Sequence, residues 1–174
     1  MKLRLLLHLL NLRYYQSNLI STETEFINET AIKPVFTLLA DKNFESAEND
    51  FITAYDHYEH SRYRDTITYC CCAFESTLKK ILKLQNINYK ETDNAHLLLD
   101  LYIKNNKNLP NFIVKNTNKL KEFLQSLTNL RNEKGPHGHT EKEEIPEYYA
   151  LYMINMTAST VRFLIEANKA NSNK

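Results

Sequence analysis

A short stretch of the chain, residues 131–140, gathers residue types that could act on a phosphate group. It holds Arg131, Asn132, His137 and His139 together with both glycines of the 174-residue chain. Glycine is used where the backbone must turn sharply or approach another group closely. Because both glycines lie beside one arginine and two histidines, the sequence predicts a functional site in this stretch.

Arginine and histidine together suit the cleavage of RNA by its own 2′-hydroxyl group. A histidine with a pKa near neutrality transfers protons, and a planar guanidinium binds phosphate oxygens and stabilises a transferring phosphoryl group. This reaction needs a base, an acid and a phosphate-binding group, but no metal and no cofactor. His137 supplies half of the acid–base pair, and a twofold dimer with two facing copies would supply both halves. Asn132 is a candidate to bind phosphate or orient the segment. His139 is a second candidate histidine, although an exposed loop residue is its plainer interpretation.

The position of Arg131 is unusual for a charged residue. Leu120, Leu124, Leu127 and Arg131 fall on one face of a helix, so the arginine takes the place of another leucine. A guanidinium there needs a carboxylate or must open onto a cleft, because an unpaired buried charge is costly. Glu75, which flanks the apolar stripe of an earlier helix, is a candidate partner. A purely structural Arg–Glu pair, or an arginine that extends outward to solvent, is the alternative.

Two histidine pairs raise the alternative of a metal site. His137 and His139 lie two residues apart with Glu141 nearby, and His57 and His60 are spaced to share a helix face. Neither pair has the two or three further ligands at a recognised spacing. We therefore expect no metal, and a cationic histidine near a helix end explains the second pair equally well.

Charge is unevenly distributed along the chain, although the net charge is only +1. Residues 1–78 carry 7 basic and 11 acidic residues, residues 79–134 carry 11 and 5, and residues 135–174 carry 4 and 5. The middle third would therefore present a cationic face to a polyanion such as RNA. An ordinary solvated helix surface explains the same pattern.

The N-terminal residues and the cysteines indicate the cellular compartment of the protein. Residues 2–10 form a leucine-rich run that is too short to span a bilayer and has no cleavage site for a signal peptide. We expect this run to be a helix that packs on the domain or on another subunit, with no membrane association. Cys70, Cys71 and Cys72 are consecutive and form no disulfide framework, which favours small apolar residues in a reducing cytoplasm.

The rest of the sequence favours helices throughout. Two glycines and four prolines leave little material for hairpins. Apolar residues recur with helical spacing, which predicts an all-α antiparallel bundle of about six to seven helices. The predicted helices span about 22–40, 44–60, 62–84, 93–104 and 117–134, and a final helix begins near Pro146.

Three stretches of the sequence resemble a known family. Arg131-Asn132 followed by His137-Gly138 resembles the RN-x4-HG core of the abortive infection protein C-terminal family, which belongs to the HEPN superfamily. Residues 69–79 resemble a helix of that family with an Ala-x-Glu-Ser pattern, and the helix after Ile145 is also similar. The resemblance covers about residues 44–168, preceded by a predicted helical extension over 1–43 and followed by a polar tail over 169–174.

The resemblance implies a dimeric, cytoplasmic, HEPN-like bundle with a metal-independent endoribonuclease site at the dimer interface. It also implies a toxin-type role in phage defence or in a toxin–antitoxin system, with an antitoxin or a sensor as a further partner. Arg131 and His137 match the catalytic pair, Asn132 matches the polar residue after the arginine, and Glu75 matches an acidic supporting position. Some members of the superfamily have lost catalysis, so a non-catalytic module for dimerisation or for binding RNA or nucleotides is the alternative.

Overall fold

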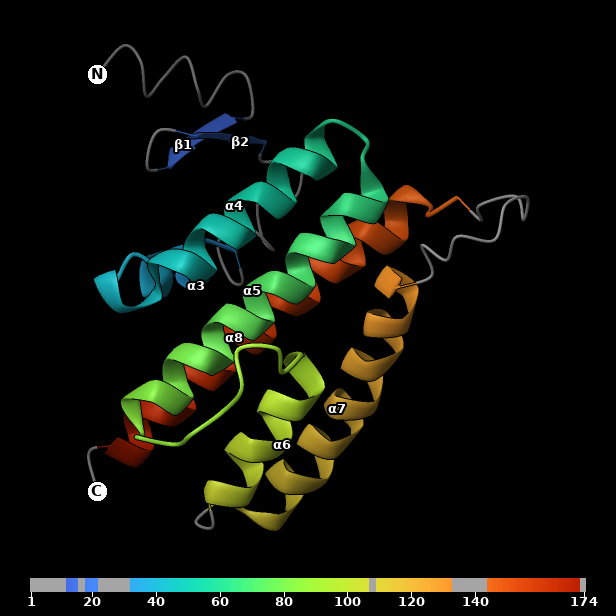
Figure 1. Cartoon of the computed structure of the whole chain (residues 1–174). Helices are drawn as coiled ribbons and strands as arrows, with labels where there is room; N and C mark the ends of the chain where they lie inside the picture. Colours follow the sequence, from blue (N-terminus) through green and yellow to red (C-terminus); the bar gives the residue numbers. More distant parts are fainter. Residues whose placement is uncertain (1–11, 16–17, 22–31, 107–108, 133–143, 173–174) are drawn as a thin grey trace.

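The computed structural model describes residues 12–15, 18–21, 32–106, 109–132 and 144–172, and for residues 12–15, 18–21, 126–132 and 172 it describes the backbone alone. In these residues a short β-hairpin is followed by six α-helices (Figure 1). The helices are Lys33–Leu39 (α3), Glu45–Glu59 (α4), Tyr63–Leu84 (α5), Ala95–Asn105 (α6), Asn111–Asn132 (α7) and Glu147–Ser172 (α8), with a 3-10 helix, η2, at Lys42–Phe44. The predicted helical bundle is therefore confirmed for the described residues from 32 onward.

The hairpin is a departure from the predicted helical extension over residues 1–43. Strands β1 (Leu12–Tyr15) and β2 (Asn18–Ser21) pair antiparallel, with Leu12 opposite Ser21 and Tyr15 opposite Asn18. The prediction was wrong for these residues, because tyrosine and isoleucine favour strands and only two residues separate the two runs. The leucine-rich run at residues 2–10 lies outside the described residues. None of the described helices combines the length and the apolar composition that crossing a bilayer requires.

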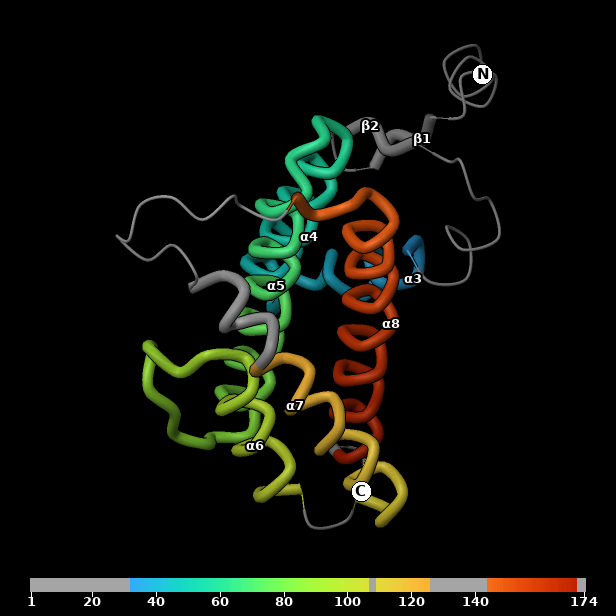
Figure 2. The backbone as a smooth tube through the Cα atoms, turned by 90° about the vertical axis from the view of Figure 1, so that its right-hand side faces the viewer, coloured from blue at the N-terminus to red at the C-terminus, as the bar shows by residue number. Residues whose placement is uncertain are grey.

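Helix α5 lies at the centre of the bundle and packs against α4, α6, α7 and α8 (Figures 1 and 2). The helical spacing of its apolar residues predicted a buried stripe, and every member of that stripe is buried. Each such side chain contributes about 1.5–3 kcal/mol through removal from water. The buried residues of this stripe are Ile67, Cys71, Phe74, Leu78, Ile81 and Leu82.

The turns at the two ends of α5 are made without glycine. Ser61 has a backbone φ of 56° and Asn86 one of 55°, so both residues are in the left-handed region. Glycine is the usual residue in that region, but its two copies lie at 135 and 138, outside the described residues. Asparagine tolerates this conformation better than most residues, which suits the end of α5.

Helix α7 begins at Asn111, six residues before the predicted start at 117. The polar run of residues 116–118 resembles a loop in sequence, but Thr117 is only 4% exposed. Its hydroxyl donates to the backbone carbonyl of Ile113 over 2.7 Å, so a polar residue is accommodated on the inward face of the helix. The carbonyl of Pro110 accepts from the N–H of Val114 at 3.1 Å, so the first helical turn starts from the proline.

The three cysteines are free thiols, and both Cys70 and Cys71 are buried in the core. Burial raises the pKa of the Cys70 thiol to about 12. A thiol with such a pKa stays protonated and unreactive at neutral pH. The expectation that these residues pack as small apolar side chains agrees with their positions.

Candidate active site

The candidate site begins at the last described turn of α7, which carries Arg131 and Asn132. Arg131 occupies the helix position in line with Leu120 and Leu124, and Leu124 is 1% exposed. His137 and His139 lie outside the described residues, and so do the side chains of Arg131 and Asn132. The structure therefore places the backbone of Arg131, and the position of that backbone depends on the contacts that hold α7 against its neighbours.

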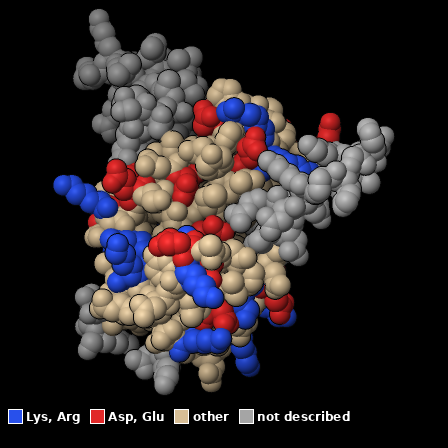
Figure 3. All heavy atoms as spheres, in the orientation of Figure 1, with Lys and Arg blue, Asp and Glu red and all other residues tan. Residues whose placement is uncertain are grey.

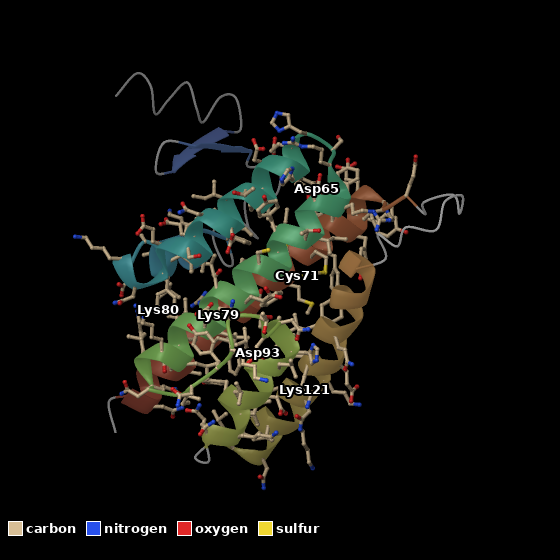
Figure 4. The ribbon with its side chains drawn as sticks, in the orientation of Figure 1. Asp65, Cys71, Lys79, Lys80, Asp93 and Lys121 are labelled. Carbon is tan, nitrogen blue, oxygen red and sulfur yellow. The ribbon has the colours of Figure 1, made fainter. Side chains whose placement is uncertain are left out.

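Helix α7 is held along α6 by a charged cluster. Asp100 on α6 accepts hydrogen bonds from Lys104 at 2.6 Å and from Lys121 of α7 at 2.9 Å. These bonds from Lys104 and Lys121 hold the pKa of the Asp100 carboxyl below its ordinary value. Lys121 lies on the side of α7 that meets α6 (Figure 4). This ion pair links α7 to α6 at Lys121, ten residues before Arg131.

A ring contact joins α7 to the final helix. Phe123 on α7 and Tyr152 on α8 meet edge to face, with ring centroids 6.4 Å apart. Edge-to-face pairs add about 0.5–1.5 kcal/mol beyond the apolar area that they bury. Arg131 follows Phe123 by two helical turns, so this contact also bears on the position of the end of α7.

Glu75, the predicted partner of Arg131, makes its described contact with a different helix. Its Oε1 accepts a hydrogen bond from the backbone N–H of Ala95, the first residue of α6, at 3.3 Å. Asn94, the N-cap residue of α6, makes no capping bond with its own side chain. Glu75 therefore satisfies a free N–H at the start of α6 and places its negative charge at the positive end of that helix.

Two neighbours of Glu75 also tie α5 to the surrounding structure. Ser76 donates from its hydroxyl to Oδ2 of Asp50 on α4 at 2.6 Å. Lys79 donates to the backbone carbonyl of Glu91 at 2.7 Å, in the connection between α5 and α6 (Figure 4). The Glu-Ser-x-x-Lys part of the family-like helix therefore holds three separate elements against α5.

The capping contact leads to a prediction about stability. Replacing Glu75 by alanine should lower the free energy of unfolding by about 1 kcal/mol, because the N–H of Ala95 loses its acceptor. Replacing Glu75 by glutamine keeps an acceptor oxygen at the same place and should cost roughly half as much or less. Urea denaturation of the two variants measures the difference. If the glutamine variant unfolds as readily as the alanine variant, the hydrogen bond is not the stabilising contact.

A histidine that the sequence analysis did not single out lies beside this cap. His96 follows Ala95, and its Nδ1 is buried without a hydrogen-bond partner among the described residues, as is Oδ1 of Asn94. No spacing pattern marks a lone histidine in the first turn of a helix. Only the packing of α6 against α5 shows that this histidine and Glu75 belong to the same part of the molecule.

The second histidine pair contacts separate groups. The ring of His57 stacks on Tyr69 of α5, with centroids 4.9 Å apart. Nδ1 of His60 lies 2.7 Å from the carbonyl oxygen of Asp56 and 3.5 Å from its Oδ1. Within the described ranges, no group of three or more histidine, cysteine or acidic residues is arranged to hold a metal ion. The other candidate pair, His137 and His139, lies outside those ranges, and so does the nearby Glu141.

The charge of the middle third is partly neutralised by pairs within the segment. Lys79 pairs with Glu91 at 3.4 Å, and Lys119 pairs with Glu122 at 3.3 Å, in addition to the two lysines on Asp100. Basic and acidic side chains alternate over the described surface of one face of the molecule (Figure 3). The positive charge of this surface is therefore weaker than the excess of basic over acidic residues in 79–134 suggests.

The fold and the candidate site define a helical-bundle protein with an arginine at the end of a long helix and a histidine shortly after it. The family model of a HEPN-like domain, Abi_C, matches residues 45–168, which is well over half of the chain. The chain therefore belongs to the HEPN-like Abi_C family, and the resemblance noted in the sequence is confirmed. Comparisons with curated proteins and with solved structures found no match.

Proposed function

We propose that this protein is a metal-independent endoribonuclease of the toxin type, acting in phage defence or in a toxin–antitoxin system. The observation that carries the proposal is the position of Arg131 and Asn132 in the last described turn of α7, six and five residues before His137, in a HEPN-like chain. Members of this family that keep the arginine and the histidine are expected to be active. An antitoxin or sensor protein and a cytoplasmic location belong to the same proposal.

The proposed reaction moves two protons and one phosphoryl group. A histidine acting as base takes the proton of the 2′-hydroxyl, and the 2′-oxygen forms a bond to the adjacent phosphorus. The bond from phosphorus to the 5′-oxygen breaks, and that oxygen receives a proton from the second histidine. Arg131 stabilises the negative charge that grows on the phosphoryl oxygens, and Asn132 supports the same phosphate. The products are a 2′,3′-cyclic phosphate and a 5′-hydroxyl end.

The base and the acid come from two copies of His137 in a twofold dimer. One chain supplies a single His137, whereas the reaction needs one histidine to accept a proton and another to donate one. A twofold axis places the same residue of each copy on opposite sides of the axis, so two such segments can face one phosphate. His139 of the same chain is the second candidate for this role.

A non-catalytic module for dimerisation or for binding RNA or nucleotides is the second candidate function. The contacts of Glu75, Ser76 and Lys79 favour it, because all three residues of the family-like helix hold neighbouring elements in place. The resemblance of this helix to the family is therefore explained by its role in the fold, without a catalytic role. The two functions are distinguished by whether Arg131 and His137 are needed for cleavage of RNA.

The test is cleavage of RNA by the purified chain in the presence of EDTA. Cleavage is expected to persist with the chelator present and to leave 2′,3′-cyclic phosphate and 5′-hydroxyl ends, which end-labelling distinguishes from 3′-hydroxyl and 5′-phosphate ends. Loss of cleavage with EDTA and its recovery with zinc would favour a metal site instead. RNA that is bound but not cut would favour the non-catalytic module.

A further inference from the structure

Three aromatic rings form a connected row where α7 meets α8. Phe123 of α7 meets the ring of Tyr152 edge to face, with centroids 6.4 Å apart. Tyr149 contacts the same tyrosine, with centroids 6.0 Å apart and 31° between the ring planes. Tyr152 is therefore held by two rings, yet it stays 50% exposed. A ring that is held in place and half open to solvent is preorganised to stack on another flat group.

Tyr148 adds a second open ring on the same side of α8. It precedes Tyr152 by four residues, so the two side chains are neighbours on one helix face. Its exposed fraction of 76% is the largest among the large apolar side chains that the structure describes. We call Phe123, Tyr148, Tyr149 and Tyr152 the ring patch.

The ring patch lies in a stretch without charge. No acidic or basic residue occurs between Glu147 and Arg162. Glu147, which directly precedes the patch, accepts a hydrogen bond from the hydroxyl of Tyr58 on α4 at 3.1 Å. Its carboxylate is therefore directed toward α4. A ligand of the patch is recognised through its flat apolar surface and not through an ion pair.

The open area of the ring patch is small. After Tyr152, the next exposed position of α8 is Ser159, so the open apolar surface does not continue directly along the helix. The rings of Tyr148 and Tyr152 together expose roughly 200–300 Å², since an aromatic side chain has about 150–250 Å² of surface. A stable protein interface takes about 800 Å² from each partner. The patch therefore suits a few flat groups better than the face of another protein.

The ring patch lies close to the helix end that carries Arg131. Phe123 precedes Arg131 by eight residues, which is about 12 Å along α7. Tyr152 lies in the second turn of α8, and α8 begins at the end of the bundle where α7 ends (Figure 1). An RNA strand whose phosphate is held by Arg131 would therefore have bases within reach of the patch.

We infer that the ring patch stacks on bases of single-stranded RNA beside the phosphate that is cleaved. This inference rests on the proposed function, because it names the part of the RNA substrate that binds next to Arg131. Single-stranded RNA is favoured over duplex RNA, because the bases of a duplex are already stacked on one another. Every base has a flat face, so stacking supplies affinity with little preference for sequence.

The test is the binding of a short single-stranded RNA to the full chain, measured by fluorescence anisotropy. The RNA carries 2′-O-methyl groups, which block attack by the 2′-oxygen, so binding is measured without cleavage. Tyr148→Ala and Tyr152→Ala should each raise the dissociation constant by roughly fivefold to a hundredfold. Tyr152→Phe keeps the ring and should stay within about twofold of the wild type. Phe163→Ala is the matched control, because Phe163 is 37% exposed on the same helix beyond Ser159, and it should leave binding unchanged.

A fluorescent base separates stacking from an effect on the fold. 2-Aminopurine in the RNA loses fluorescence when it stacks on an aromatic ring. The wild type and Tyr152→Phe should therefore quench it, whereas the two alanine variants should quench it less. Tyr148→Ala is the decisive variant, because it leaves the contact between Phe123 and Tyr152 in place. Circular dichroism checks that all variants keep the helical content of the wild type.

The outcomes separate this inference from the proposed function. Unchanged binding in both alanine variants, or an equal loss in Phe163→Ala, overturns the inference. A Tyr152→Ala chain that has a lower mass than the wild type in sedimentation equilibrium, with unchanged RNA affinity, overturns it in favour of a protein interface. Wild-type chain that binds RNA through the rings without cleaving it supports the inference, while the proposed function fails. Cleavage that needs His137 but has the same KM in both alanine variants overturns the inference and leaves the proposed function standing.

Discussion

Replacing His137 by alanine is expected to reduce RNA cleavage by roughly a hundredfold to ten-thousandfold. The imidazole is the group proposed to accept the 2′-hydroxyl proton in one copy and to donate a proton to the leaving 5′-oxygen in the other. In a symmetric dimer the substitution removes both groups at once, so the loss should lie toward the upper end of this range. The measurement is the initial rate of cleavage of a labelled RNA under single-turnover conditions.

The neighbouring histidine provides the matched control for this experiment. His139→Ala removes the same side chain two residues further along, and it should leave most of the cleavage rate if His139 is an exposed loop residue. Arg131→Lys keeps the positive charge but loses the planar pair of donors that binds phosphate oxygens. It should therefore also reduce the rate of cleavage. RNA cleavage or cellular toxicity that is the same in His137→Ala as in the wild type would exclude the enzyme.

Replacing Phe74 by alanine is expected to lower the free energy of unfolding by about 3–5 kcal/mol. Phe74 lies in the middle of α5, its side chain is fully buried, and α5 packs against four other helices. The substitution removes a ring from the centre of this packing and leaves a cavity that the rigid helices close only in part. Domains of this kind have a total stability of about 5–15 kcal/mol, so much of it would be lost.

The effect is measured by urea denaturation followed through helical circular dichroism. Phe112→Ala is the matched control, because it makes the same substitution at an exposed position of α7, and it should change the stability by less than about 0.5 kcal/mol. Equal losses for the two variants would contradict the central packing position of Phe74. A large loss at Phe74 alone would support the placement of α5 in the core.

The sequence predicted the helices whose apolar stripes are long and regular. The stripe from Ile67 to Leu82 established α5, and Pro146 marked the start of α8. The start of α7 was predicted too late, because the polar residue Thr117 resembles part of a loop in sequence. Its hydroxyl is bonded to a carbonyl of its own helix, and its burial depends on packing that the sequence does not show. The hairpin was missed because its four-residue strands are too short to show a clear alternating pattern.

The candidate site was predictable in part. The stripe from Leu120 to Arg131 and the two glycines pointed to a helix end with an arginine, and α7 carries Arg131 in its last described turn. The contact of Glu75 with Ala95 was not predictable, because it joins residues 20 positions apart whose pairing depends on how α6 meets α5. Asn94 holds the N-cap position of α6, but Glu75 of another helix supplies the acceptor for the N–H of Ala95.

The length of α7 makes the position of Arg131 sensitive to contacts far from it. The helix has 22 residues and so extends about 33 Å from the end at Asn111. A tilt of about 5° at that end would move the other end by about 3 Å, which is as large as a hydrogen bond is long. Reacting groups must be placed more closely than this for catalysis. The ion pair at Asp100 links α7 to α6, and Glu75 caps the start of α6. A partner protein that shifts α6 would therefore tilt α7 and change which groups Arg131 can reach, although the partner itself does not contact Arg131.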